Sequence, residues 1–128
     1  MTDKCLHYCF SEASTTLIKK IPSDVFSNEI EQICFVYFQE FVKTYGTKPS
    51  KVTFKNYLSS KTIPEIVLPE VEATYQPLFE VFEDSAEYYR SILIKELTKR
   101  VMLNSMRNAA KFIHEDLDKA EREAASMM

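Results

Sequence analysis

Glycine is almost absent from this chain of 128 residues, and Gly46 is the only one. Phosphate-cradling loops and dinucleotide-binding fingerprints need several glycines at fixed spacing, because only glycine lets the backbone approach a phosphate closely. Most tight turns between β-strands depend on glycine as well. The composition therefore excludes a Walker-type nucleotide pocket within these residues.

Long apolar runs and targeting signals are also lacking. Nothing in the chain approaches the roughly 18 consecutive apolar residues of a membrane span, and the first residues, Met1-Thr2-Asp3-Lys4, carry no cleavable leader pattern. The three cysteines, Cys5, Cys9 and Cys34, are an odd number, which favours free thiols in a reducing compartment. We therefore expect a cytoplasmic protein without a membrane segment.

The composition is that of one ordinary globular domain, with 45% hydrophobic and 27% charged residues. Net charge is −3, and it is unevenly spread. Residues 1–64 hold 8 Lys/Arg and 6 Asp/Glu, whereas residues 65–128 hold 8 and 13, so the halves carry +2 and −5. Neither half is basic enough to wrap a nucleic-acid backbone, and we expect no direct sequence-specific nucleic-acid binding.

Apolar spacing predicts helices along the first half of the chain. One or two short helices, with Ser11 or Ser14 as possible N-caps, end before Pro22. A longer helix should begin at the N-cap Ser27 and end at Gly46, because its apolar residues recur every three or four positions. The apolar positions of that helix are Ile30, Cys34, Phe35, Tyr37, Phe38, Phe41, Val42 and Tyr45.

The middle of the chain is less regular. Ser50 should cap a short helix that buries Val52, Phe54 and Leu58. Residues 59–69 contain Pro64 and Pro69 on either side of the apolar run 66–68. This run could form a brief extended segment. Another short helix is expected over the apolar residues 78–82, with Pro77 in its first turn.

The last third of the chain, from Asp84 onward, contains neither glycine nor proline. Asp84 and Glu87 are spaced as a capping box. The segment is either one helix of more than 40 residues or two helices joined by a polar turn near residues 114–118. The predicted fold is therefore all-α: a small helical globular head, residues 1–84, with a long C-terminal helix or partial helical hairpin, residues 85–128.

The apolar face of this long segment changes sides along its length. An early group, Ala86, Tyr89, Ile92, Leu93 and Leu97, occupies one side of a helix with 100° per residue. A later group occupies another side at spacings of 4, 3, 4, 4, 3 and 4, which is typical of a helix that packs lengthwise on another helix. We predict that this later group is a protein interface: Met102, Met106, Ala109, Ile113, Leu117, Ala120 and Ala124.

Three other kinds of functional site have weaker support in the sequence than the protein interface. Cys5, His7 and Cys9 could contribute to a zinc site, but the further ligands are missing. No histidine has an evident nucleophilic partner, so no catalytic residues are predicted. A basic cluster around Gly46, interleaved with aromatic residues, could contact nucleic acid, although a solvated rim is the favoured interpretation. Its members are Lys43, Lys48, Lys51 and Lys55 with Tyr45, Phe54 and Tyr57.

Three sequence features follow one another along the chain. The first is an early helix ending in Leu17-Ile18, followed by the phrase Asp24-Val25-Phe26-Ser27-Asn28-Glu29-Ile30-Glu31-Gln32-Ile33-Cys34-Phe35. The second is Tyr45-Gly46-Thr47-Lys48-Pro49 with Val52, Phe54 and Leu58. The third is Tyr88-Tyr89-Arg90, leading through residues 97–103 to Ala109-Ala110. Together they span roughly residues 5–115, and in this order they resemble the N-terminal domain of DnaB-type replicative DNA helicases, including those of bacteriophages.

The resemblance implies a helical head and a helical hairpin that together form the collar of a ring hexamer. It also implies self-association, as a dimer or within the hexamer, and docking of a primase or a helicase loader. ATP and Mg²⁺ would then be cofactors of a separate motor domain, which is absent here, and this chain would need none. The sequence departs from the family in having no glycine or proline near the expected hairpin turn.

Two other functions stay open on sequence grounds. The chain could be a free-standing helical adaptor or inhibitor that binds replication proteins. It could also be the helicase-binding domain of a primase, which is likewise helical with a terminal hairpin.

Overall fold

The computed structural model describes the backbone of residues 3–126 and the side-chain surroundings of residues 4–109. All regular structure in this part of the chain is helical, which confirms the predicted all-α fold with a long C-terminal helix. The chain divides into two compact units, Met1–Leu93 and Ile94–Met128. The boundary between the two units lies inside the last helix. The assignment of residues 1–84 to a head and of residues 85–128 to an arm stays a prediction.

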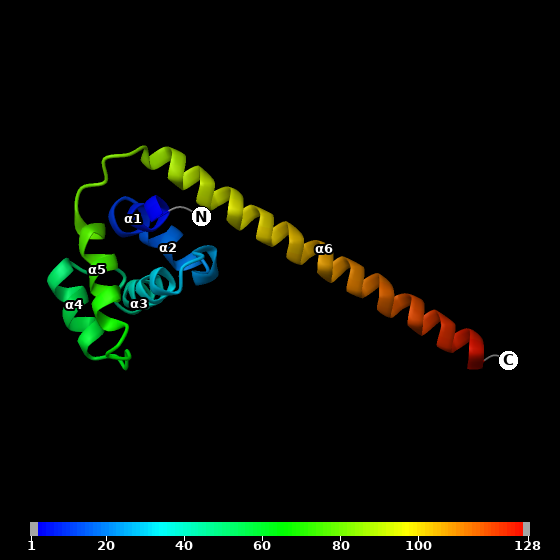
Figure 1. Ribbon diagram of the computed structural model, residues 1–128. Coiled ribbons are helices and arrows are strands. Elements are labelled where there is room, and N and C mark those ends of the chain that lie inside the picture. The colour runs from blue at the N-terminus through cyan, green and yellow to red at the C-terminus, as the bar shows by residue number, and fades with distance from the viewer. Residues whose placement is uncertain (1–2, 127–128) are drawn as a thin grey trace. The chain divides into compact units, whose positions relative to one another are not determined.

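The first unit is a bundle of short helices around one longer helix (Figure 1). The longer helix, α3, packs against α1, α2 and α5, and α1 packs against the short 3₁₀ helix η2. In chain order the elements are α1 (Asp3–Ser11), α2 (Thr15–Lys20), η1 (Ser23–Val25), α3 (Glu29–Tyr45), α4 (Lys51–Ser59), α5 (Leu68–Tyr75) and η2 (Gln76–Phe79).

Side-chain caps set the helix limits. Ser14 and Ser50 cap α2 and α4, as predicted, by accepting hydrogen bonds from backbone amides three residues on. Gly46 ends α3 in the left-handed conformation with φ of 73°, also as predicted. The predicted cap Ser27 is wrong by one residue, because Asn28 Oδ1 accepts the amides of Ile30 and Glu31.

The segment after α4 differs most from its prediction. No extended piece forms at residues 66–68; a turn follows Pro64, and helix α5 begins at Leu68 with a proline in its first turn. Proline is tolerated there because the first amides of a helix have no intrahelical acceptor. Val71 and Tyr75, one turn apart on α5, are both buried. Burial of this face, rather than a side-chain cap, accounts for the helix.

Aromatic rings fill the core of the first unit. The Phe10 ring stacks on Phe38 at 3.9 Å between centroids, and Phe54 meets Phe10, Phe38, Tyr75 and Phe79 at 5.1–6.0 Å. Phe38 and Phe54 have no exposed surface. Edge-to-face contacts of this kind stabilise a core beyond the area that they bury.

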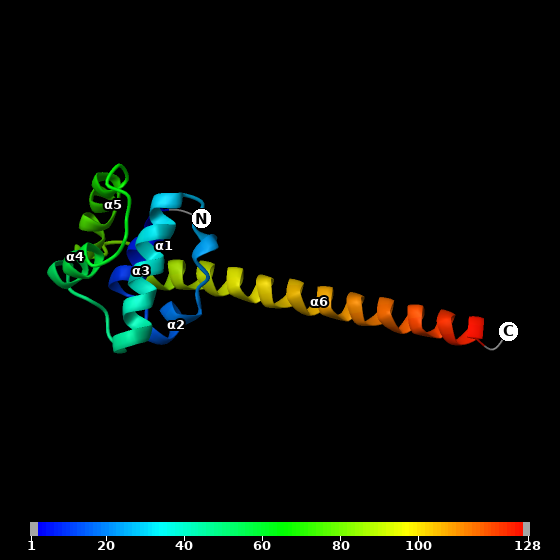
Figure 2. The same cartoon turned by 90° about the horizontal axis from the view of Figure 1, so that it is seen from below.

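Helix α6 (Ala86–Ser126) is continuous over 41 residues and is drawn as one uninterrupted helical ribbon in Figure 2. Of the two predicted alternatives, the structure adopts the long helix, without a turn near residues 114–118. Its start differs from the predicted Asp84–Glu87 capping box. Ser85 Oγ accepts the amide of Tyr88, and Asp84 Oδ1 accepts the amide of Ser85.

Candidate protein-interaction surface

The predicted interface begins on the second unit, in the part of α6 that follows Leu93. Met102 and Met106 keep 60% and 66% of their surface exposed, and Ala109 is also exposed. Thioethers this open to water are unusual, because methionine is normally buried. The remaining predicted positions, Ile113, Leu117, Ala120 and Ala124, lie outside the residues whose side chains the structure describes.

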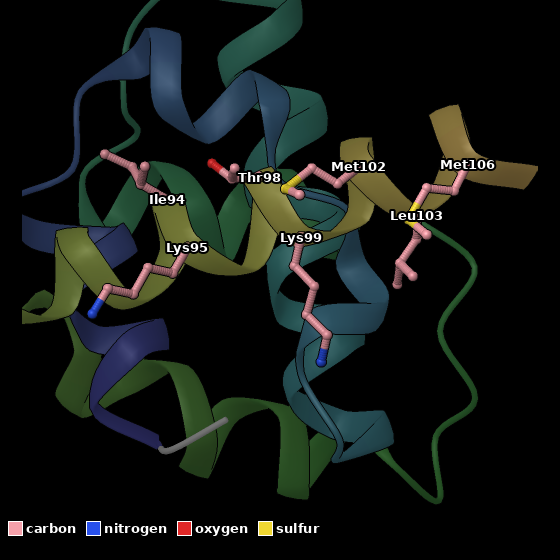
Figure 3. Close-up of a pocket in the computed structure, with 7 residues that line it drawn as sticks. All are labelled: Ile94, Lys95, Thr98, Lys99, Met102, Leu103 and Met106. Atoms are coloured by element: carbon pink, nitrogen blue, oxygen red, sulfur yellow. The ribbon is translucent and has the colours of Figure 1, made fainter. Parts of the chain in front are cut away.

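A shallow groove of about 360 Å³ runs along this part of α6 (Figure 3). Its walls are almost entirely apolar, because the stems of two lysines add carbon atoms to those of the aliphatic residues. Figure 3 shows the side chains of Lys95 and Lys99 extending to one side of the helix. The lining residues are Ile94, Lys95, Thr98, Lys99, Met102, Leu103 and Met106.

Sequence reasoning identified two of these seven lining residues, Met102 and Met106. It did not include the lysines because the predicted row was built from apolar residues alone. The signal was present: Lys95, Lys99 and Leu103 are spaced four apart, so they follow the methionines as a parallel row on the helix surface. We name the row of Met102, Met106 and Ala109 the methionine stripe.

The start of α6 buries a different side. Tyr89 and Leu93 are 8% and 1% exposed, and the Tyr89 ring meets Phe82 edge-on at 5.6 Å. At 100° per residue, these two positions lie about 140° around the helix from the methionine stripe. The sequence prediction of two differently oriented apolar faces therefore agrees with burial at Tyr89 and Leu93 and exposure at the methionines.

The cysteines are unsuited to chemistry at neutral pH. Cys5, Cys9 and Cys34 are fully buried. Burial raises the pKa of Cys9 well above its usual range and that of Cys34 to about 12, so both remain thiols rather than nucleophilic thiolates. His7 Nε2 lies 3.0 Å from the Glu80 carbonyl oxygen. Among the described residues, no group of three metal-ligating side chains comes together.

The residues of the basic cluster around Gly46 have different surroundings. Lys48 Nζ donates to the carbonyl oxygen of Ser11 at 2.9 Å, which caps the C-terminal end of α1, and partial burial lowers the pKa of Lys48. Phe54 is wholly buried and so cannot stack on a base. Lys43, Lys51 and Lys55 are exposed, which fits the solvated rim that the sequence favoured.

A polar cluster joins α3 to α4 on the surface of the first unit. Glu40 Oε1 accepts hydrogen bonds from Tyr57 Oη at 2.5 Å and from Lys61 Nζ at 2.6 Å, and the Lys61 ammonium lies 4.6 Å from the Tyr57 ring centroid. The hydrogen bond from Lys61 lowers the pKa of Glu40, and the same bond raises the pKa of Lys61. These bonds link α3 to α4 and to the residues that follow α4, so the cluster contributes to the packing of the first unit.

Within the described part of the chain, none of the helices is both long enough and apolar enough to cross a bilayer. Comparisons of this chain with protein families, with curated proteins and with solved structures find no match.

Proposed function

We propose that this chain is the N-terminal assembly and partner-recruitment domain of a DnaB-type replicative DNA helicase. In this role it forms part of the collar of a ring hexamer and docks a primase or a helicase loader in the cytoplasm. It performs no catalysis itself, and ATP and Mg²⁺ act in a separate motor domain.

The observation that carries the proposal is the exposed methionine stripe. Met102 and Met106 present flexible, polarizable side chains to water on a helix that continues well beyond them. Methionine suits adaptable protein interfaces, and exposed apolar patches commonly mark sites of association. The ordered resemblance over residues 5–115 supplies the specific context of a helicase collar.

The buried thiols and the engaged polar groups support a binding role over an enzymatic one. Cys9 and Cys34 are protonated and closed to solvent. The Glu40 carboxylate already accepts hydrogen bonds from Tyr57 and Lys61.

Sedimentation velocity over a range of concentrations tests the assembly role. We expect a concentration-dependent dimer or larger oligomer for the wild-type chain. Met106→Glu should weaken it by more than about 100-fold, because an unpaired carboxylate would be buried. Val101→Glu is the matched control: Val101 is 65% exposed but lies about 120° from the stripe, so its substitution should leave assembly unchanged. A wild-type chain that stays monomeric at high concentration would contradict the assembly role.

The replication context needs a separate test. The genomic reading frame should continue past codon 128 into a RecA-like motor, and the chain should bind the primase or loader of the same replication system in a titration by calorimetry. A stop directly after codon 128 would contradict the helicase assignment. Primase or loader binding by such a short product would instead support the free-standing adaptor or inhibitor.

A further inference from the structure

The methionine stripe and the four later positions of the predicted interface form one row along α6, and the spacing of this row is symmetric about residue 113. Helix α6 reaches Ser126, so its backbone carries the later positions of the stripe. The seven positions, 102, 106, 109, 113, 117, 120 and 124, fall within an arc of about 80° at 100° per residue. Their spacings read the same in both directions from position 113. Two copies of α6 in opposite directions therefore bring stripe positions level with one another at every step.

The sizes of the residues also favour opposite directions. The bulky residues Met102 and Met106 occupy one end of the row, and Ala120 and Ala124 occupy the other. With residue 113 facing its own counterpart, each methionine faces an alanine. A pair in the same direction would place methionine on methionine and alanine on alanine. Close packing requires large residues to face small ones, so the antiparallel pair fills the interface more evenly.

Charge along α6 favours the same arrangement. In this register residues 100–126 of the two copies overlap. Residues 100–112 hold three Lys/Arg and no Asp/Glu, whereas residues 114–126 hold two and five, so the halves on either side of residue 113 carry +3 and −3. An antiparallel pair matches the basic half of each copy with the acidic half of the other, whereas a parallel pair sets like charge against like.

We infer that the occupant of the methionine stripe is a second copy of this chain, with the two α6 helices antiparallel and residue 113 of each facing its counterpart. The inference rests on the self-association in the proposed function and adds the direction and register of the pair. Such a contact is two-fold symmetric, so each copy uses the same surface and this contact by itself joins only two copies.

Disulfide trapping in the full chain tests the register. Met106→Cys is mixed with Ala120→Cys that carries a larger tag, the mixture is oxidised mildly, and the products are separated without reductant. We expect the mixed cross-link to exceed either self-cross-link by about tenfold. Two copies of residue 106 would lie about 21 Å apart along an antiparallel pair, beyond the roughly 6 Å that a disulfide spans. Ile113→Cys alone should cross-link with itself.

Wild type and Val101→Cys serve as controls, because the native cysteines are buried and Val101 lies off the stripe. Circular dichroism checks that each variant keeps its helix content. Efficient self-cross-linking of Met106→Cys would show a parallel pair and overturn the inference, while self-association would stand. A chain that dimerises by sedimentation but forms neither the 106–120, nor the 113–113, nor the 106–106 cross-link would place the contact elsewhere and also overturn the inference. A strictly monomeric wild-type chain would overturn both the inference and the assembly role.

Discussion

Replacing Met102 and Met106 together by alanine separates the stability of the chain from its association. Both side chains are more than half exposed, at 60% and 66%, so the single chain gains little from them. Alanine is the strongest helix former, so the substitutions keep α6 helical. We therefore expect the substitutions to weaken the association between copies and to leave the stability of the single chain nearly unchanged.

The magnitude follows from the surface still available for burial. Each substitution removes three heavy atoms, worth about 0.8 kcal/mol each when fully buried. Because about two thirds of each side chain is exposed, roughly 1.5 kcal/mol per methionine depends on the partner. Four methionines in a symmetric pair give about 6 kcal/mol, or about 10⁴-fold in the dissociation constant. Neighbouring contacts do not add fully, so about 100-fold is the smallest effect consistent with this reasoning.

Sedimentation equilibrium of the double variant measures the dissociation constant, and thermal unfolding at a concentration below dimerisation checks the single chain. Val101→Ala is the control, since Val101 is 65% exposed on another side of α6. A dissociation constant within about threefold of wild type, or an equal loss in Val101→Ala, would refute the assignment of the stripe as an interface.

Three further predictions concern the first unit. Phe54→Ala should lower the free energy of unfolding by about 3–5 kcal/mol, since it opens a cavity among four aromatic rings, and chemical denaturation measures this loss. Gly46→Ala should cost about 1 kcal/mol in the same assay, because a side chain at φ of 73° is strained although nothing lies within 4 Å of the new Cβ; an unchanged midpoint would contradict this. The pKa of Glu40 is lowered in the folded chain, so its stabilising effect is present above the ordinary glutamate pKa of about 4.3 and is lost as the pH falls through the lower folded value. Lys61→Met should flatten that part of the stability–pH profile, and an unaltered acid limb would show that the ion pair is not its cause.

Local signals predicted much of the first unit because they act within one turn of helix. Gly46 tolerates the left-handed conformation and the Ser50 hydroxyl accepts a nearby amide, so both act through local geometry, and the structure uses both as predicted. Helix α5 was not predicted, because packing in the core stabilises it rather than a local sequence signal. Its N-terminus lacks a side-chain cap, and the apolar spacing of Val71 and Tyr75 gains meaning only when they pack in the core.

The candidate surface was only partly predictable for a related reason. Periodicity identified Met102 and Met106, since a stripe at three- and four-residue spacing is visible in the letters alone. The role of Lys95 and Lys99 as walls of the groove depends on where their stems lie, which the chemical type of a residue does not reveal. The choice between hairpin and single helix was open in the sequence, and without glycine or proline near residues 114–118 the chain continues as helix.

The change of apolar side along α6 constrains any account of its function. A helix that packs against one body along its whole length keeps its apolar row on one side. In α6 the side that carries Tyr89 and Leu93 lies about 140° around the helix from the side that carries Met102 and Met106, and burial falls from nearly complete at Leu93 to less than half at Met102. A buried side of the helix is therefore followed, within three turns, by an exposed apolar one. The second row keeps its helical spacing beyond that point, as a helix that packs against another helix would. Its spacing is palindromic and its large residues lie at one end, so an antiparallel copy of α6 is the best-matched partner.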